Sequence, residues 1–320
     1  MKVLIADKFE KPGLEKLNEL GCAVTLDADL SGESLRDAVR DSEAQVLVVR
    51  STKVTPEILE AGKHLELIIR AGAGYDTIDF KAAAERGIRV CNCPGKNSVA
   101  VAELAFGLML ALDRRIVDNT VDLRNAVWAK KEYGKARGIK GRTLGIVGLG
   151  RIGYEIARRA AAFEMKLLYS DVIDQKEMER ELGIRKVPLE QLLTEADFIT
   201  LHVPGGEQTR HMIGEAQLAM MKPTAFVINC SRGGVVDEKA LAAAVESGTM
   251  AGAGLDVYEI EPLATGKEFN DPVVNTKGVY GTHHIGASTE QAQLAVADEV
   301  VRIIETKMKG GDPPNCVNRA

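Results

Sequence analysis

Aromatic residues and long hydrophobic runs are both scarce in this sequence. Phe, Trp and Tyr make up 4% of its 320 residues, and no stretch approaches the roughly 20 apolar residues that a membrane-spanning helix needs. The N-terminal run Val3–Asp7 is too short for the core of a signal peptide and predicts a strand instead. These absences exclude a membrane span and predict a soluble, cytoplasmic protein.

An excess of charge of either sign is also missing. The chain has 41 basic and 46 acidic side chains, which give a formal net charge of −5. Nucleic acids and anionic membranes attract proteins through an excess of clustered Lys and Arg. We therefore expect neither kind of partner.

Cysteines are few and lack the spacing of a metal or redox motif. There are five, an odd number, and Cys91 and Cys93 are separated by one residue rather than by the two of a C-x-x-C motif. No second pair follows at zinc-finger distance. Both residues end a strand-like run, so we interpret them as small reduced residues. We expect no metal site and, in a reducing cytoplasm, no disulfide.

The sequence does contain a glycine motif between a strand pattern and a helix pattern. Gly148, Gly150 and Gly153 form G-x-G-x-x-G between the apolar run Thr143–Leu149 and the amphipathic segment Ile152–Phe163. The first glycine permits a tight turn, the second lets backbone amides approach a pyrophosphate, and the third lets helix and strand pack closely. The free N–H groups at the start of the helix favour phosphates. The motif predicts a bound dinucleotide.

Asp171 indicates which dinucleotide this is. It ends the next apolar run, where a carboxylate can accept hydrogen bonds from both ribose hydroxyls. The same negative charge would repel a 2′-phosphate. We therefore predict NAD rather than NADP as the cofactor.

The order of these patterns predicts an α/β protein with two doubly wound parallel sheets. In residues 1–95, short β-branched runs alternate with amphipathic segments, which is typical of a parallel sheet covered by helices on both faces. A long Ala-rich helix is expected from Asn97 to about Asp118. Six strands follow from the glycine motif onward, and a last helix, at about 289–309, is expected to return to the first lobe.

This order divides the chain into a discontinuous lobe and an inserted lobe. We predict a flavodoxin-like substrate lobe formed by residues 1–97 and 288–320. A Rossmann lobe for NAD is predicted over residues 98–287.

Polar residues follow three of the predicted strands of the inserted lobe. Ligands of α/β proteins bind at the carboxyl ends of strands, so one of His283 and His284 is the candidate acid or base. The planar guanidinium of Arg232 suits bidentate binding of a carboxylate. Three carboxylates, Asp256, Glu259 and Glu261, follow a third strand. One of them could stabilise a charged histidine, and the sequence pattern alone does not show which.

The other three histidines are interpreted differently. His64 and His211 lie in polar stretches and are expected at the surface. His202, inside a predicted strand, is expected to be a structural residue near the cofactor.

Nearly the whole chain resembles the D-isomer-specific 2-hydroxyacid dehydrogenases, and most closely the D-3-phosphoglycerate dehydrogenases among them. The resemblance rests on the order and spacing of five segments. They are Arg70 to Asp76, the glycine motif, Asn229 to Asp237, Asp256-Val257-Tyr258 through Glu261-Pro262, and His284 to Thr289.

This resemblance implies a role for each matching residue. Arg232 would orient the substrate carboxylate, His284 would donate the proton in reduction, and Glu261 would be its partner. Asp256 would contact the nicotinamide carboxamide. Ala73 and Gly74 would hold the substrate carboxylate, while Arg50 and Ser51 would recognise the far end of the substrate. The remaining cofactor contacts would come from Arg151, Ile152, Val203, Cys230, Ser231 and Gly286.

Three departures from the family pattern concern the substrate and the histidine. His283 stands where the family commonly has proline, and we assign it to the shell around the site or to packing. The loop that begins at Arg50 and Ser51 is one residue shorter than in phosphoglycerate-type members. Lys130 and Lys131 stand where related enzymes often have arginine, and they could meet a phosphate or form a solvated basic loop.

The resemblance implies oxidation of D-3-phosphoglycerate to 3-phosphohydroxypyruvate, the first step of serine biosynthesis. The alternatives are a glyoxylate/hydroxypyruvate or D-lactate-type reductase and, in another class, a non-enzymatic NAD-sensing protein like the transcriptional co-repressors. A homodimer, or a tetramer, is implied. No serine feedback through a C-terminal regulatory domain is expected.

Overall fold

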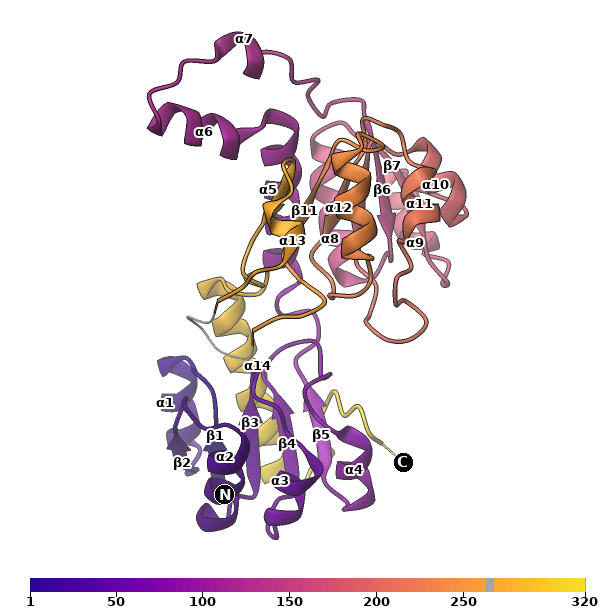
Figure 1. The fold of residues 1–320 in the computed structure, drawn as a ribbon. Coiled ribbons are helices and arrows are strands. Elements are labelled where there is room, and N and C mark those ends of the chain that lie inside the picture. The colour runs from indigo at the N-terminus through magenta and orange to yellow at the C-terminus, as the bar shows by residue number, and fades with distance from the viewer. Residues whose placement is uncertain (263–267, 320) are drawn as a thin grey trace. The chain divides into compact units, whose positions relative to one another are not determined.

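The computed structural model describes residues 1–262 and 268–319, which form two compact units. Unit 1 consists of Met1–Asn97 and Ala287–Ala320, and unit 2 consists of Ser98–Gly286. The second junction therefore falls at Ala287, one residue before the position expected from the sequence. Figure 1 shows the chain from end to end.

Unit 1 is built on a five-stranded parallel sheet of order β2-β1-β3-β4-β5, a flavodoxin-like order. The strands are β1 (Lys2–Ile5), β2 (Ala23–Leu26), β3 (Val46–Val49), β4 (Leu67–Arg70) and β5 (Arg89–Asn92). The helices are α1 (Lys11–Glu19), α2 (Gly32–Ser42), α3 (Pro56–Ala61), α4 (Phe80–Glu85) and α14 (Glu290–Met308).

Two hydrophobic clusters, one on each face, hold this sheet between helices. Leu35, Ile58 and Ala83, from α2, α3 and α4, pack against one face. Leu17 of α1 and Ile303 of α14 pack against the other. The last helix thus returns to the first sheet, as its sequence predicted.

Unit 2 is built on a seven-stranded parallel sheet of order β12-β11-β10-β9-β6-β7-β8. The strands are β6 (Thr143–Val147), β7 (Lys166–Ser170), β8 (Arg185–Lys186), β9 (Phe198–Leu201), β10 (Phe226–Asn229), β11 (Gly252–Leu255) and β12 (Val279–Gly281). Counted from β6, the first six strands have the 3-2-1-4-5-6 order of a dinucleotide-binding Rossmann fold. Both predicted sheets are therefore confirmed.

Helices cover both faces of this second sheet. One hydrophobic cluster includes α5 and α8, and the other includes α10, α11 and α12. The helices of the unit are α5 (Ser98–Arg114), α6 (Ile116–Arg124), α7 (Lys130–Tyr133), α8 (Arg151–Ala162), α9 (Lys176–Leu182), α10 (Leu189–Glu195), α11 (Glu215–Ala219), α12 (Glu238–Glu246) and α13 (Pro272–Asn275).

Two sequence predictions for unit 2 were wrong. The helix expected to continue to about Asp118 ends at Arg114, because Arg115 adopts a left-handed conformation (φ 49°) and α6 then begins. Strand β8 was not predicted, since two residues are too short to form a recognisable pattern. Figure 1 shows α6 and α7 as an arm that extends away from the sheet of unit 2.

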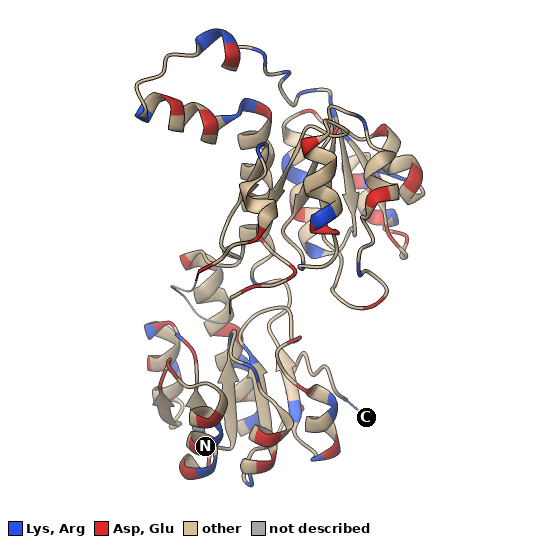
Figure 2. Cartoon of the chain, in the orientation of Figure 1, with Lys and Arg blue, Asp and Glu red and all other residues tan. Residues whose placement is uncertain are grey.

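Charge is distributed evenly over both units. Figure 2 shows basic and acidic residues interspersed on the helices, which agrees with the near balance of the two signs. Across residues 1–262 and 268–319, no helix is long and apolar enough to cross a bilayer.

Candidate active site

The glycine motif lies in the turn between β6 and α8, as its sequence context predicted. Gly148 has φ +90°, and a Cβ at this position would lie 2.6 Å from the carbonyl oxygen of His202. A Cβ at Gly153 would lie 2.3 Å from the carbonyl oxygen of Gly148. Any side chain at Gly148 or Gly153 would clash with a backbone carbonyl, so the close packing of the turn requires glycine at both positions.

Gly150 differs from the other two because the space above it is open. Apart from Gly150 itself and the residues next to it in the chain, no heavy atom lies within 4 Å of the position that its Cβ would take. It directly precedes the first residue of α8, where unpaired N–H groups point outward. This open backbone surface at a helix start fits the pyrophosphate of a dinucleotide.

Asp171 directly follows β7 and is connected to the glycine turn by hydrogen bonds. Its Oδ2 accepts from the backbone N–H of Leu149 at 2.7 Å, and its Oδ1 accepts from that of Ile173 at 3.0 Å. The carboxylate is thus fixed beside the turn, and it keeps lone pairs that can accept ribose hydroxyls. The residues present fit the adenosine end of NAD.

Arg232 lies in a turn that the buried side chain of Asn229 stabilises. Asn229 Oδ1 accepts hydrogen bonds from the N–H and the hydroxyl of Ser231, at 3.0 and 2.7 Å. Its Nδ2 donates to the carbonyl of Arg232 at 3.0 Å. This amide, which the sequence reasoning missed, could be recognised as a polar residue at the end of an otherwise apolar strand.

The turn of Arg232 also packs tightly against the loop after β11. A Cβ at Gly233 would lie 1.8 Å from the carbonyl oxygen of Tyr258, so only glycine fits there. The guanidinium of Arg232 donates to the carbonyl of Ser231 at 2.7 Å. Its charge acts on Glu261, which lies in the same loop as Tyr258.

Glu261 and His284 form a pair. Oε2 of Glu261 lies 2.7 Å from Nδ1 of His284, while Oε1 accepts from the N–H of Tyr258 at 3.1 Å. Burial, the strongest single influence, acts to raise the pKa of Glu261. The hydrogen bond and charge of His284, together with the smaller effects of Tyr258 and Arg232, hold this pKa below its usual range. Glu261 is therefore a carboxylate at neutral pH.

This pairing fixes which nitrogen of His284 can act on a substrate. A carboxylate against Nδ1 keeps the proton there, so Nε2 is the atom that can exchange a proton with another group. The imidazole is half exposed, which leaves it accessible. Its backbone has a positive φ of 52°, an uncommon conformation for a residue other than glycine.

Asp256, 1% exposed, holds the loop that carries His284. Its Oδ1 accepts from the hydroxyl of Thr282 at 2.6 Å and from the N–H of Ile285 at 2.8 Å, and its Oδ2 accepts from the N–H of Gly286 at 2.8 Å. The carboxylate thus anchors the chain on both sides of the histidine. Contact with a nicotinamide carboxamide stays a prediction for Asp256.

The other cofactor contacts predicted in unit 2 lie near the carboxyl ends of the strands. Val203 and Ile152 are partly buried and pack against the two cores. Cys230 is buried, and burial raises the pKa of its thiol well above the usual range. Arg151 is the first residue of α8.

The remaining histidines are spread over different environments. Burial lowers the pKa of His202 to about 3, so its imidazole is neutral, with Nε2 2.9 Å from the hydroxyl of Thr200. His211 is paired with Glu259, whereas His284 is paired with Glu261, so Glu259 is not the partner of His284. His283 is exposed, which contradicts a packing role, while a place in the shell around the site stays a prediction.

In unit 1, the predicted substrate residues also follow strands. The carboxylate of Asp7 accepts from the backbone N–H groups of Arg50 and Ser51, at 2.6 and 3.2 Å, and from the Ser51 hydroxyl at 3.0 Å. The N–H of Thr52 donates to the same carboxylate at 3.2 Å. Asp7 was missed, although its position after the first strand is the kind of signal that identified Asp171.

The loop of Ala73 and Gly74 has a support of its own. Asn92, at the end of β5, donates from Nδ2 to the carbonyl of Ala73 at 2.6 Å. The N–H of Cys93 donates to the carbonyl of Gly72 at 2.8 Å. These contacts hold the loop against the end of the sheet, with both residues partly exposed.

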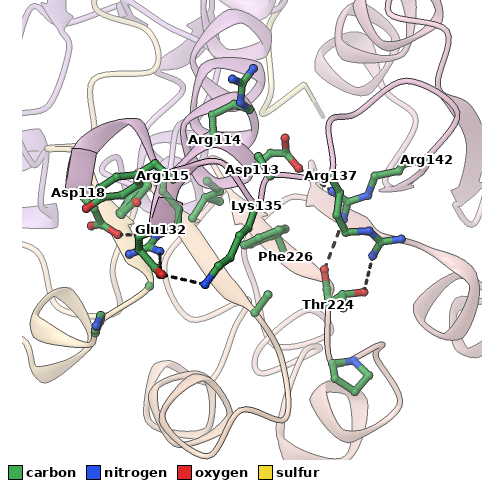
Figure 3. A pocket seen from close by; sticks show the side chains of 18 residues that line it. Asp113, Arg114, Arg115, Asp118, Glu132, Lys135, Arg137, Arg142, Thr224 and Phe226 are labelled. Carbon is green, nitrogen blue, oxygen red and sulfur yellow. Dashed lines mark hydrogen bonds and ion pairs between the residues drawn. The ribbon is translucent and has the colours of Figure 1, made fainter. Parts of the chain in front are cut away.

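A cavity of about 510 Å³ in unit 2 lies away from these residues. Its lining includes Phe226, at the start of β10, and Ala251, just before β11. Figure 3 shows Glu132 paired with Arg115, at 2.6 Å, and with Lys135, at 3.0 Å. It therefore belongs to the amino ends of the strands, opposite to the candidate active site. No group of three or more metal-ligating side chains occurs in the described parts of the chain.

The fold and these residues define a dinucleotide-binding α/β protein with an arginine and a carboxylate–histidine pair. The model of the D-isomer specific 2-hydroxyacid dehydrogenase NAD binding domain matches residues 106–286. The chain belongs to this family, and its cofactor is NAD.

Similar proteins carry several substrate names. The chain is 42% identical over 320 residues to a D-3-phosphoglycerate dehydrogenase of Methanocaldococcus jannaschii, covering 99% of this chain but only 59% of that protein. It is 44% identical over 291 residues to a glyoxylate reductase of Thermococcus litoralis, covering 89% of this chain and 86% of the relative. A D-lactate dehydrogenase of Aquifex aeolicus, solved with NAD and lactic acid, is 27% identical with a TM-score of 0.86 over 100% of both chains.

Proposed function

We propose that the chain interconverts a D-2-hydroxyacid and the corresponding 2-oxo acid with NAD. The observation that carries this proposal is the 2.7 Å contact of Glu261 with Nδ1 of His284, in a unit that also presents Arg232. When bound, NAD supplies a nicotinamide carbon that accepts or donates a hydride.

The residues of unit 2 supply the acid–base chemistry. In reduction, protonated His284 donates from Nε2 to the oxygen at C2 of the substrate, and Glu261 stabilises the imidazolium before the transfer. The guanidinium of Arg232 binds the substrate carboxylate and polarises the reacting oxygen. In oxidation, neutral His284 takes the hydroxyl proton.

For the substrate, we propose D-3-phosphoglycerate, oxidised to 3-phosphohydroxypyruvate at the start of serine biosynthesis. The N–H groups of Ala73 and Gly74 would bind the carboxylate of the substrate. Arg50 would bind the phosphate with its guanidinium. The relative from Methanocaldococcus jannaschii that bears this substrate name supports the proposal.

A short 2-oxo acid such as glyoxylate or hydroxypyruvate is the second candidate. The backbone N–H groups of Arg50, Ser51 and Thr52 all donate to Asp7, so they are already used inside unit 1. A phosphate would then depend mainly on the Arg50 side chain. The glyoxylate reductase of Thermococcus litoralis supports this alternative.

Initial rates of NADH oxidation with four 2-oxo acids test the proposal. We expect kcat/KM for phosphohydroxypyruvate to exceed the values for hydroxypyruvate, glyoxylate and pyruvate at least tenfold. Arg50→Ala should remove this advantage without changing kcat/KM for glyoxylate. Arg40→Ala, an exposed arginine in the same unit, serves as the control. If the wild type reduces hydroxypyruvate and phosphohydroxypyruvate with equal kcat/KM, the phosphoglycerate proposal is wrong and the short-acid reductase is favoured.

His284→Ala separates an enzyme from an NAD-sensing protein. Loss of a general acid costs about 10²- to 10⁴-fold in rate, whereas His283→Ala, at the exposed neighbour, should change kcat little. NAD binding without measurable turnover of any 2-oxo acid would favour the co-repressor-like alternative.

We propose a homodimer formed through the arm of α6 and α7. None of the residues of α6 is buried, and the exposed apolar side chains of the arm are Ile116, Val117, Val121, Leu123, Val127 and Trp128. Large apolar patches on a protein surface mark interaction sites, and the patch on the arm supports this proposal. Light scattering after size exclusion should give a dimer for the wild type and a monomer for the double variant Val121→Asp, Leu123→Asp.

A further inference from the structure

The segment that follows α14 lies antiparallel to β5, the edge strand of unit 1. The N–H of Val317 donates to the carbonyl of Val90 at 2.8 Å, and the N–H of Asn92 donates to the carbonyl of Asn315 at 3.2 Å. These two bonds flank Cys91 and Cys316, which therefore face each other as a bridged pair without hydrogen bonds between their own backbones. Antiparallel pairs of this kind have Cα atoms about 4.5 Å apart, with their side chains close together. That spacing lies within the range of about 4.4–6.8 Å that a disulfide spans.

The two thiols interact in the reduced protein. Burial, followed by the charge and the hydrogen bond of Cys316, raises the pKa of Cys91 to about 12. Cys91 is fully buried, whereas Cys316 is partly exposed. One thiol of the pair can thus be reached by a small solute, and the other lies directly behind it.

Polar groups surround the outer sulfur. The Sγ of Cys316 lies 3.9 Å from a guanidinium nitrogen of Arg89 and 3.4 Å from Oδ1 of Asn318. The guanidinium places a positive charge where a thiolate would form. Reactive cysteines characteristically lie in such partly exposed, electropositive surroundings.

We propose that Cys91 and Cys316 are an oxidative modification site at which a peroxide forms an intramolecular disulfide. The thiolate of Cys316 attacks one oxygen of hydrogen peroxide, breaks the O–O bond and becomes a sulfenic acid, while the other oxygen leaves as water after protonation. Cys91 then attacks the sulfenic sulfur, loses its proton and expels the hydroxyl as a second water. In total, two thiols are oxidised and one peroxide is reduced to two waters.

The link would change how unit 1 is held together. The segments 1–97 and 287–320 are joined through the whole of unit 2, and only non-covalent contacts hold them side by side. A disulfide between β5 and the C-terminal segment joins them directly and closes a long loop, which restricts the unfolded chain. Because the inner thiol is protonated, we expect formation over minutes to hours rather than seconds.

Peptide mapping tests the site. The full chain is treated with hydrogen peroxide for an hour, alkylated under denaturing conditions and digested with trypsin without reductant. We expect a linked pair formed by the peptide Val90–Lys96 and the peptide Gly310–Arg319, which reductant separates. We also expect the oxidised protein to melt on the order of 5 °C higher, and dithiothreitol to reverse this rise.

Three variants identify the sulfurs. Cys316→Ser and Cys91→Ala should each abolish the linked peptide and the reversible rise in Tm. Cys93→Ala removes the other thiol of the same tryptic peptide and should keep both. A link that survives Cys91→Ala, a link only between two chains, or oxidation of Cys316 to sulfinic acid without a link would each overturn the proposal.

Discussion

The carboxylate of Asp256 accepts a hydrogen bond from the backbone N–H of Gly286 at 2.8 Å and holds the loop that carries His284. A Cβ on Gly286 would lie 2.9 Å from this carboxylate, so any larger residue would force the carboxylate or the loop to shift. Since the other oxygen of Asp256 binds Thr282 and Ile285, one buried side chain fixes the loop on both sides of the histidine. The unusual backbone conformation of His284 is stabilised in this way.

Asp256→Asn should therefore impair the histidine without touching it. In the variant, the NH₂ group of the amide would face groups that donate to Asp256 in the wild type, so at least one hydrogen bond would be lost. Buried hydrogen bonds to a charged group are worth about 1.5–3 kcal/mol each. We expect kcat to fall at least tenfold and Tm to fall by several degrees. Asp298→Asn, at an exposed carboxylate, is the control. An unchanged kcat in a variant with lowered Tm would show that the loop does not position His284.

Glu261→Gln removes a charge and retains an acceptor oxygen at the same place. A neutral amide stabilises an imidazolium less than a carboxylate does. We expect kcat for 2-oxo acid reduction to fall about 10- to 100-fold, while KM for NADH changes less than twofold. Glu259→Gln, in the same loop, should leave kcat within a factor of three. Equal losses in the two variants would count against Glu261 as the partner.

Two glycines of the same motif should respond to alanine in different ways. At Gly153 the added methyl meets the carbonyl of Gly148, and overpacking of this kind costs about 1–3 kcal/mol. At Gly150 the methyl meets no protein atom and instead occupies the open surface above the turn. We expect Gly153→Ala to lower Tm, and Gly150→Ala to keep Tm while weakening NAD binding at least tenfold by calorimetry. Normal NAD binding by a folded Gly150→Ala variant would place the pyrophosphate elsewhere.

Asp171 holds the glycine turn in addition to its predicted role in recognising NAD. Asp171→Ala should raise KM for NAD and relax the preference over NADP at least tenfold, because the negative charge is lost. Asp171→Asn keeps an acceptor for the N–H of Leu149, so it should separate the effect of charge from that of turn geometry. We expect the asparagine variant to relax the preference with less effect on Tm. A wild type that already prefers NADP would overturn the assignment.

The sequence was a good guide wherever a pattern repeated along the chain. Strands with continuous apolar runs, such as Phe198–Leu201, and the glycine turn were predicted because each depends on neighbouring residues. The end of α5 was missed because Arg115 takes a left-handed conformation that its residue type does not demand. Tertiary contacts decide such a position.

The supports of the site were harder to predict than the site itself. Glu261 and Glu259 are equivalent by spacing, and only the fold pairs one with His284 and the other with His211. Asp7 and Asn92 act through contacts with loops distant in sequence. These contacts depend on which strands are neighbours in the sheet. The order of the strands in a sheet cannot be read from a single sequence.

Glu238 is a buried carboxyl group of unit 2 that should link stability to pH. It is 7% exposed at the start of α12, and its Oε1 accepts from the N–H of Glu259 at 2.7 Å. Burial, with smaller contributions from the charges of Asp271 and Glu259, raises its pKa from 4.5 to about 7. The folded protein therefore keeps a proton on Glu238 that the unfolded chain loses above pH 4.5.

Glu238 therefore makes its full contribution to the free energy of unfolding below about pH 4.5. This contribution falls by up to about 3 kcal/mol as the pH rises to about 7. Glu238→Gln should remove this dependence, because its amide oxygen still accepts from Glu259 and its NH₂ group can donate towards Asp271. We expect Tm of the variant to equal that of the wild type at pH 4 and to exceed it by several degrees at pH 8. Glu246→Gln, exposed at the other end of the same helix, should leave the pH profile unchanged. Parallel pH profiles of Tm for wild type and Glu238→Gln would mean that Glu238 is ionised in the folded protein.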